Sequence, residues 1–248
     1  MRTVASYHLK GGVGKTTSAI AVAVQSATKG HRTLLWDLDP LGAATRLAGA
    51  TRAEEGRGWL GGPQLDLDRV LEPTSQEQLS VLPAARALRR VDRDPATEDT
   101  ARRRLGAVLE AAATRFDVLI VDCPPAVSAL TPPLLEAAHI VLAPLTAGPL
   151  AWSAYADLAE EVEAVADGAQ DRLLAFLTMV DRRKGLHRDL VEDLQETPDG
   201  FSAIQVPTDS SVERMALDAD PFRAVRSGRA AQAYALLTEE ILALAARR

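Results

Sequence analysis

The N-terminal part of the chain contains a glycine- and lysine-rich run of the kind that binds phosphate groups. The apolar stretch Thr3–Leu9 leads directly into Lys10-Gly11-Gly12-Val13-Gly14-Lys15-Thr16-Thr17, and a helical pattern follows over Thr16–Thr28. Glycines let successive backbone N–H groups turn toward one anion, and the N-terminus of the next helix adds partial positive charge. We expect Lys15 to reach the β- and γ-phosphates of a nucleotide and the Thr16 hydroxyl to ligate Mg²⁺. The predicted phosphate-contacting residues are Gly11, Gly12, Val13, Gly14, Lys15, Thr16 and Thr17.

The start of this loop departs from the usual G-x-x-x-x-G-K-[ST] spacing. Leu9 occupies the place of the first glycine, and Lys10 follows it. A side chain at position 10 cannot easily fold back past two glycines onto the phosphates of its own subunit. We therefore expect Lys10 to reach a nucleotide held by a second subunit, in the role that an arginine finger plays elsewhere.

Carboxylates follow two strand-like runs. Trp36-Asp37-Leu38-Asp39-Pro40 ends one of them, and Phe116–Asp122 is an apolar run that ends in a carboxylate. Asp39 is the predicted general base or water-positioning residue, with a cap on the turn before Pro40 as the alternative. Asp122 is predicted to hold Mg²⁺, through a water, together with Thr16. For Asp37, a structural role and a functional one are about equally supported.

The elements that must position these residues alternate along the chain. Such alternation predicts an α/β protein with a mostly parallel twisted sheet, helices on both faces, and a single domain over residues 1–248. The expected strands are Thr3–Leu9, Thr33–Leu38, Leu79–Leu82, Val118–Asp122, Ile140–Leu145, Leu173–Val180 and Ala203–Val206. The expected helices are Thr16–Thr28, Thr97–Thr114, Leu150–Ala166, Leu186–Glu196 and Gly228–Ala246.

Composition excludes several classes of protein. The 248 residues are 47% hydrophobic and 25% charged, which is typical of soluble globular proteins. The single cysteine, Cys123, allows no disulfide within one chain and argues against a carrier of a metal cluster, because a dimer would offer only two thiolates. No uninterrupted apolar run reaches about 18 residues, so we expect a cytoplasmic protein without a membrane span. The net charge of -6 means that any nucleic-acid binding must come from a local basic patch.

The run Lys10–Thr17 resembles the deviant Walker A box of the ParA/MinD family of ATPases. The resemblance continues through Asp37–Pro40, Val81–Ala84, Phe116–Pro125, Leu177–Arg183 and Val206-Pro207, and it is strongest to the small ParA/Soj type. It implies a P-loop ATPase that binds ATP and Mg²⁺ and forms a sandwich homodimer in the ATP state. It further implies that Asp39 is the catalytic carboxylate and that adenine lies near Met179, Pro207, Thr208 and Asp209. Cys123-Pro124-Pro125 matches the second switch of the family, and we interpret Cys123 itself as a packed residue.

The resemblance also implies partners. The ATP-bound dimer of this family binds DNA without reading sequence, is associated with the nucleoid, and positions a plasmid, chromosome or protein complex. A separate adaptor protein, ParB-like or equivalent, stimulates hydrolysis. The candidate DNA contacts, carried over by region, are Arg182, Arg183, Arg188, Arg223, Arg226 and Arg229, although basic clusters are often only solvated surface. The sequence departs from the family at Leu41, where glutamine is usual, and at His8 and Leu9, which stand beside Lys10.

Two other functions remain open from the sequence. One is a metabolic ligase on the same scaffold, in which ATP activates a small carboxylate and turnover depends on that metabolite. The other is a MinD-like membrane-associated regulator, which the C-terminal stretch Tyr234–Leu244 disfavours because it carries two acidic residues.

Overall fold

The computed structural model describes residues 1–54, 58–61, 65–193 and 200–247. Within these ranges the centre of the molecule is a seven-stranded sheet of order β3-β4-β2-β5-β1-β6-β7. All neighbouring strands are parallel except the short edge strand β3, which is antiparallel to β4. The strands are β1 Arg2–Ser6, β2 Thr33–Asp37, β3 Glu72–Pro73, β4 Leu79–Leu82, β5 Val118–Asp122, β6 Ile140–Thr146 and β7 Leu173–Thr178. The predicted α/β class and mostly parallel sheet are confirmed.

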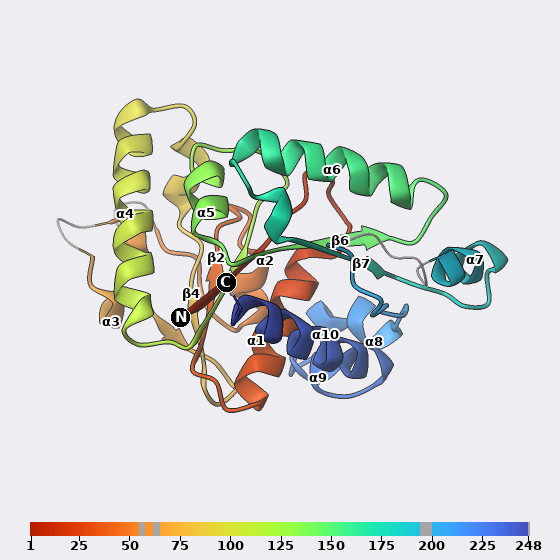
Figure 1. Ribbon diagram of the computed structural model, residues 1–248. Helices are drawn as coiled ribbons and strands as arrows, with labels where there is room; N and C mark the ends of the chain where they lie inside the picture. The colour runs from red at the N-terminus through yellow and green to blue at the C-terminus, as the bar shows by residue number, and fades with distance from the viewer. Residues whose placement is uncertain (55–57, 62–64, 194–199, 248) are drawn as a thin grey trace.

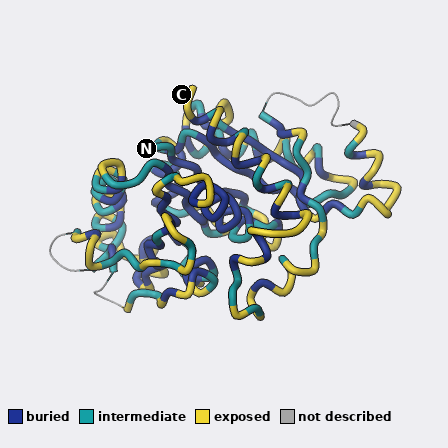
Figure 2. Tube along the Cα trace, turned by 90° about the horizontal axis from the view of Figure 1, so that it is seen from below, coloured by how far each residue is buried: buried dark blue, intermediate teal, exposed yellow. Residues whose placement is uncertain are grey.

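Helices cover both faces of the sheet (Figure 1). One face packs against α1 (Lys15–Thr28), α9 (Arg223–Arg226) and α10 (Arg229–Ala245), and the other against α5 (Thr131–Ala137) and α6 (Ala151–Val165), with α4 (Pro95–Ala113) alongside. The sequence of β5 explains why both faces of the sheet are covered. Its residues are apolar up to Asp122, and successive side chains point into opposite layers. Leu119 and Val121 join the core beneath α4 and α5, whereas Val118 and Ile120 join the core beneath α1 and α10. The central strands and α1 are buried along almost their whole length (Figure 2).

Shorter elements complete the described ranges. The helices are α2 Ala43–Leu47, α3 Leu67–Val70, α7 Gly185–Asp193 and α8 Ser210–Glu213, and the 3₁₀ turns are Gly58–Leu60, Arg86–Arg90 (η2), Gln170–Arg172 and Met215–Leu217. Helix α7 projects from one end of the molecule (Figure 1). No helix of the described ranges is both long and apolar enough to span a membrane.

Two predicted elements differ from the structure. The expected strand Ala203–Val206 is wrong: the segment is not a strand of the sheet. It bonds β7 through the Val206 N–H, which donates to the Leu177 carbonyl at 2.8 Å, and isolated bridges flank it at Phe201 and Pro207. The physical reason lies at Ile204, whose N–H donates to the Ser202 hydroxyl at 3.0 Å instead of entering a ladder with β7. The expected helix Leu186–Glu196 is present as α7, and the last three residues of the prediction lie outside the described residues.

The register of the sheet brings the polar residues to one edge. In the parallel ladders Ser6 is level with Asp122, and Asp37 is level with Asp122 on the other side. The Leu38 N–H continues this alignment by donating to the Asp122 carbonyl at 3.0 Å. Ligands of open α/β sheets bind at this carboxyl edge, where the loop before α1 also lies.

Candidate nucleotide-binding site

The loop between β1 and α1 has the backbone of an anion cradle. Gly12 and Gly14 have φ values of 78° and 98°, in the left-handed region that favours glycine, and Gly14 is the N-cap of α1. No side chain caps the first turn of this 14-residue helix, and the space beside Gly11 and Gly12 is open. The inner side of the loop is held in place because the Thr178 hydroxyl donates to the Val13 carbonyl at 3.1 Å. The N–H groups of the loop and the first helical turn are therefore free to bind an anion.

The two lysines of the loop have different surroundings. Lys15 is only 7% exposed, and its Nζ donates to the Lys10 carbonyl at 3.0 Å, so the ammonium group lies across its own loop. Burial lowers the pKa of Lys15, and the nearby Asp122 carboxylate opposes that shift. The Lys10 side chain, in contrast, is exposed and has no ion pair or hydrogen bond with a described residue. Lys15 is thus directed at the loop interior, whereas Lys10 is available to another molecule.

Asp122 is a fully buried carboxylate without a hydrogen-bond partner. Its exposed fraction is 0%, and neither carboxylate oxygen bonds to a described residue. Burial raises the pKa of Asp122 well above the ordinary value, and the neighbouring Asp37 carboxylate raises it further. The Thr16 side chain is near enough to lower this pKa, although it does not meet the geometry of a hydrogen bond. A buried, unpartnered carboxylate beside a hydroxyl is a donor set that suits Mg²⁺, so the residues present fit this ion.

Asp37, at the end of β2, forms hydrogen bonds within the protein. Asp37 Oδ2 accepts from both the backbone N–H and the hydroxyl of Thr45 at 2.7 Å, and its Oδ1 accepts from the Asp39 N–H at 3.1 Å. Burial raises the pKa of Asp37 to about 6, despite these hydrogen bonds. The Thr45 hydroxyl in turn accepts from the Ala84 N–H at 2.9 Å, which ties α2 to the end of β4. Of the two interpretations left open by the sequence, the structural one describes the contacts of Asp37.

Asp39 is half-buried at the same edge. Its Oδ1 accepts from the Leu41 N–H at 2.8 Å, so it does cap the turn around Pro40. The Leu41 side chain is 58% exposed, and being apolar it cannot form the hydrogen bonds of the glutamine that is usual at this position. The cap leaves the other carboxylate oxygen of Asp39 without a described partner, so the turn and a role toward a ligand are compatible.

His8 shapes the entrance to the loop. Its Nδ1 accepts from the Lys10 N–H at 3.1 Å, and the ring is buried. Burial, reinforced by the two loop lysines, lowers the pKa of His8 to about 4. The ring is therefore neutral near pH 7 and serves as a hydrogen-bond acceptor beneath Lys10.

The residues expected near adenine lie after β7. Met179 has a φ of 55°, and its Cε lies 3.9 Å from where a Cβ on Gly14 would be, so this side chain covers the phosphate loop. Pro207 and Thr208 line a cavity of about 910 Å³ next to the Val180 backbone. Asp209 is engaged elsewhere, because it caps α8 through the Ser211 N–H at 3.0 Å. The structure thus brings Met179 to the loop and Pro207 and Thr208 to a cavity, and it gives the Asp209 side chain a structural contact.

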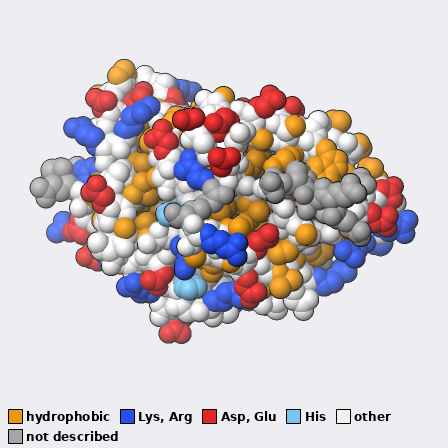
Figure 3. Space-filling view, in the orientation of Figure 1, with side chains coloured by type: hydrophobic (Ala, Val, Ile, Leu, Met, Phe, Trp, Pro, Cys, Tyr) orange, Lys and Arg blue, Asp and Glu red, His pale blue; other side chains and the backbone are white. Residues whose placement is uncertain are grey.

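The six candidate DNA contacts are mostly paired with other side chains. Arg183, Arg223 and Arg226 form ion pairs with Asp181, Asp218 and Asp220, respectively. Arg182 donates to the Gln205 side chain at 3.2 Å. Arg188 and Arg229 are exposed and have no ion pair or hydrogen bond with a described residue. On the face seen in Figure 3, basic and acidic side chains are interspersed rather than gathered in one patch.

Sequence reasoning missed some supporting residues. It did not identify Thr45, although a threonine eight residues after a buried strand-end aspartate was available as a signal. It also did not identify the Ser6 hydroxyl, which donates to the Lys15 carbonyl at 3.0 Å, or Ser18 and Tyr234, whose hydroxyls lie 3.1 Å apart and join α1 to α10. The contact between Ser18 and Tyr234 spans 216 residues, which a local pattern does not reveal.

The parallel sheet and the loop before α1 define the class: this is a nucleotide-binding protein of the P-loop NTPase type. A family model described as an AAA domain matches residues 1–175. The chain is 32% identical over 200 residues to the chromosome partitioning protein ParA of Myxococcus xanthus, covering 78% of this chain and 70% of that protein. It is 30% identical to the sporulation initiation inhibitor protein Soj of Bacillus subtilis, over 79% of each chain.

Solved structures of other proteins have the same fold. The putative plasmid partition protein of Borrelia burgdorferi bound to AMPPNP superposes with a TM-score of 0.72 at 19% identity, covering 99% of this chain and 98% of that chain. Cobyrinic acid a,c-diamide synthase of Mycobacterium smegmatis, with a bound ATP analogue and magnesium, gives 0.70 at 25% identity, covering 98% and 94%. The chain belongs to the ParA/MinD family of ATPases and is of the ParA/Soj type.

Proposed function

We propose that this protein is an ATP-switched positioning ATPase whose whole chain works as one ATPase domain. The observation that carries the proposal is the pairing of an open anion cradle with the buried, unpartnered carboxylate of Asp122 at the same sheet edge. An unpartnered buried carboxylate destabilises a protein that binds nothing there, and Mg²⁺ with a nucleotide would relieve that penalty. The likeness to ParA and Soj supports the same activity.

The loop residues divide the work of binding and hydrolysis. Lys15 exchanges its contact with the Lys10 carbonyl for the β- and γ-phosphates, and the Thr16 hydroxyl and Asp122 hold Mg²⁺, the latter through a water. When bound, Mg²⁺ neutralises charge on the phosphate oxygens. Asp39 orients the attacking water in line with the γ-phosphate.

A second subunit completes the site. The Lys10 side chain is exposed and has no ion pair or hydrogen bond with a described residue, as a cation supplied in trans must be. Three large apolar side chains are also exposed after strands that end at this edge: Leu41 at 58%, Val127 at 50% and Leu150 at 74%. Apolar side chains gathered at one edge favour a protein interface there, and ATP would bring two copies face to face across it.

DNA is the proposed matrix of the ATP-bound dimer. The side chains of Arg188 and Arg229 form no ion pair with a described residue, although Arg229 is near enough to the Asp209 carboxylate to lower its pKa, and Arg182 has only a neutral partner. These three are therefore the strongest candidates for phosphate contacts. Arg183, Arg223 and Arg226 would have to give up an ion pair to bind DNA. Binding through phosphates makes affinity fall with salt and leaves it indifferent to sequence. A separate adaptor protein would stimulate hydrolysis, and release from the nucleoid would then move the cargo.

The test measures binding of unrelated DNA duplexes with ATP, ADP or no nucleotide at several salt concentrations. We expect binding only with ATP, equal across sequences and lost at high salt. The double substitution Arg188→Ala with Arg229→Ala should weaken binding, while Arg102→Ala, which removes an arginine already paired with Glu98, should not. Binding in no nucleotide state would refute the DNA-matrix proposal. It would favour a metabolic ligase, whose turnover follows a small substrate, or a membrane-associated regulator, which would co-sediment with lipid.

A further inference from the structure

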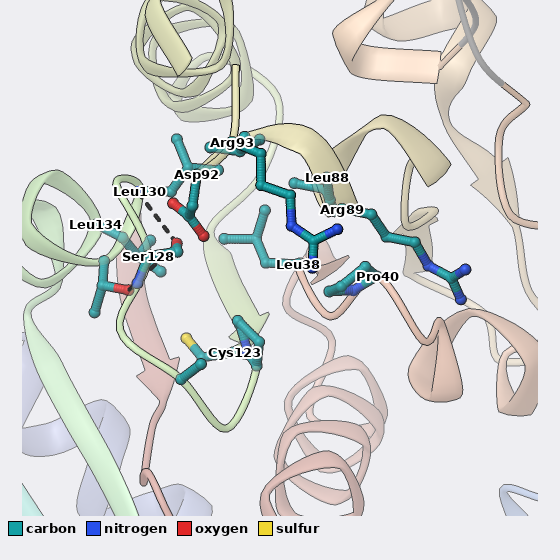
Figure 4. A pocket seen from close by; sticks show the side chains of 14 residues that line it. Leu38, Pro40, Leu88, Arg89, Asp92, Arg93, Cys123, Ser128, Leu130 and Leu134 are labelled. Atoms are coloured by element: carbon teal, nitrogen blue, oxygen red, sulfur yellow. Dashed lines mark hydrogen bonds between the residues drawn. The ribbon is translucent and has the colours of Figure 1, made fainter. Parts of the chain in front are cut away.

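A cavity of about 500 Å³ lies between the segment that follows Asp37 and the segment that follows Asp122 (Figure 4). Leu38 and Pro40, from the segment after β2, form one side, and Cys123 and Pro124, from the segment after β5, form another. The 3₁₀ turn η2 with the residues after it, and the start of α5, close the remaining sides. The volume is in the range of small-molecule sites rather than of extended grooves for a peptide.

Hydrogen bonds between neighbouring segments hold the walls of this cavity in place. Asp92, after η2, accepts from the Ala129 N–H at 2.8 Å and so ties η2 to the loop before α5. That loop is held by the Ser128 N–H, which donates to the Thr131 hydroxyl at 2.9 Å. The cavity is therefore preformed, and a ligand would not have to order it.

The floor and the mouth of the cavity have different chemistry. Leu38, Leu130 and Leu134 are at most 4% exposed and form an apolar floor. Arg89 and Arg93 line the cavity at its mouth. In Figure 4 the guanidinium of Arg93 points toward Leu38 and Pro40, whereas that of Arg89 extends past Pro40, away from Leu38.

These two arginines lack the partners that neighbouring arginines have. Both are exposed, and neither side chain has an ion pair or hydrogen bond with a described residue. Arg86, on the same turn, instead pairs with Glu54 at 3.2 Å. With Asp92 as the one lining carboxylate, two positive charges and one negative charge leave the cavity with a net charge of +1.

We propose that this cavity binds a small organic monocarboxylate, with its apolar body on the leucine floor and its carboxylate on Arg93 and Arg89. A guanidinium matches a carboxylate in a planar, two-bond geometry. A single negative charge balances the net charge of the cavity, whereas a phosphate dianion would exceed it, and the apolar floor gives a second phosphate no partner. The ligand would touch the residues directly after Asp39 and Asp122, so it is placed to sense or bias both segments.

The test compares octanoate with octanamide, which has the same length and an uncharged head group. Each is titrated into isotope-labelled protein without nucleotide, DNA or partner, and binding is followed by NMR chemical-shift changes. We expect octanoate to bind about tenfold or more tightly than octanamide, because only the carboxylate forms charge-assisted bonds to arginine. The shifted resonances should include those of residues 38–40, 88–93 and 123–134.

Variants assign the effect to the arginines. The double substitution Arg89→Ala with Arg93→Ala should bring octanoate and octanamide to equal affinity, and both positions are exposed, so the fold should be retained. Arg86→Ala is the matched control and should preserve the preference for octanoate. Equal affinities in the unsubstituted protein, no binding of octanoate, or a preference that survives the double substitution would each overturn the proposal. Since no nucleotide or DNA is present, these outcomes are independent of the proposed ATPase cycle.

Discussion

Replacing Asp122 with asparagine should stabilise the nucleotide-free protein while abolishing its response to Mg²⁺. The side chain is fully buried, and neither oxygen has a described hydrogen-bond partner. At neutral pH the protein must either bury this charge or hold a proton against the ordinary pKa of the group, and both are unfavourable. Asparagine keeps the shape of the side chain and removes the charge.

The asparagine amide is itself unpartnered, so the variant recovers only the extra cost of the charge. Leaving a buried polar group unsatisfied costs about 1–3 kcal/mol, and more when the group is charged, so we expect Asp122→Asn to raise the free energy of unfolding by at most about 1–3 kcal/mol. For a chain of this size, 1 kcal/mol corresponds to a shift in Tm of roughly 2–4 °C. The unsubstituted protein should instead gain about 2.7 kcal/mol from Mg·ATP at one hundred times Kd, a gain that the variant loses.

The pH dependence has a definite sign. Because burial raises the pKa of Asp122, the folded state holds a proton that the unfolded state lacks at pH values between the two pKa values. The unfolding free energy therefore falls as pH rises through this window. The variant should show a smaller fall, because only the part from Asp37, whose pKa is raised to about 6, is left.

Asp117→Asn, at the opposite end of β5, is the control substitution. A hydrogen bond from Arg32 lowers the pKa of Asp117 from 3.8 to about 2, so its contribution is lost as pH falls through this range. The pair is largely exposed, so the substitution should cost no more than about 1 kcal/mol. Chemical denaturation in the presence of EDTA or of Mg·ATP measures the free energy of unfolding of the unsubstituted protein and of both variants. A loss of more than about 1 kcal/mol in nucleotide-free Asp122→Asn, or full stabilisation of that variant by Mg·ATP, would refute the reasoning.

Three further substitutions test the site. Lys15→Ala should abolish nucleotide binding, because the ammonium group inside the loop is lost; calorimetry showing retained ATP affinity would contradict this. Asp39→Ala should bind ATP but not hydrolyse it, and normal phosphate release would remove its assigned role. Gly14→Ala should destabilise the protein by about 1–2 kcal/mol because its φ is 98°, whereas Gly106→Ala, in the interior of α4, should stabilise it by about 0.5–1 kcal/mol. Thermal unfolding of both glycine variants checks the pair, and equal effects would contradict the assigned backbone conformation.

The sequence predicts the sheet and the phosphate loop well because both depend on local patterns. Apolar runs with β-branched residues predict the central strands, and the glycine spacing predicts the cradle before α1. The segment Ala203–Val206 shows the limit of such patterns. Its composition favours a strand, but the Ser202 hydroxyl takes the N–H that a ladder would need.

Side-chain partners across the fold could not be predicted. Sequence spacing leaves Asp37 between two roles, and only the positions of Thr45 and Ala84 resolve its contacts. The arginines expected at DNA fall into two sequence groups, 182–188 and 223–229, and loop geometry sets the aspartates that pair with three of them. For the same reason, the sequence gives no sign that Arg89 and Arg93 line a cavity.

The most direct test of the central claim is ATP turnover by mixed subunits, one carrying Lys10→Ala and the other Asp39→Ala. Each variant alone should be inactive. If Lys10 acts on the nucleotide of the partner, a mixed dimer has one complete site, so equal mixing should restore about one quarter of the unsubstituted turnover per subunit. If the mixture stays as inactive as either variant alone, Lys10 does not act across a dimer, and the account of an ATP-switched sandwich dimer is contradicted.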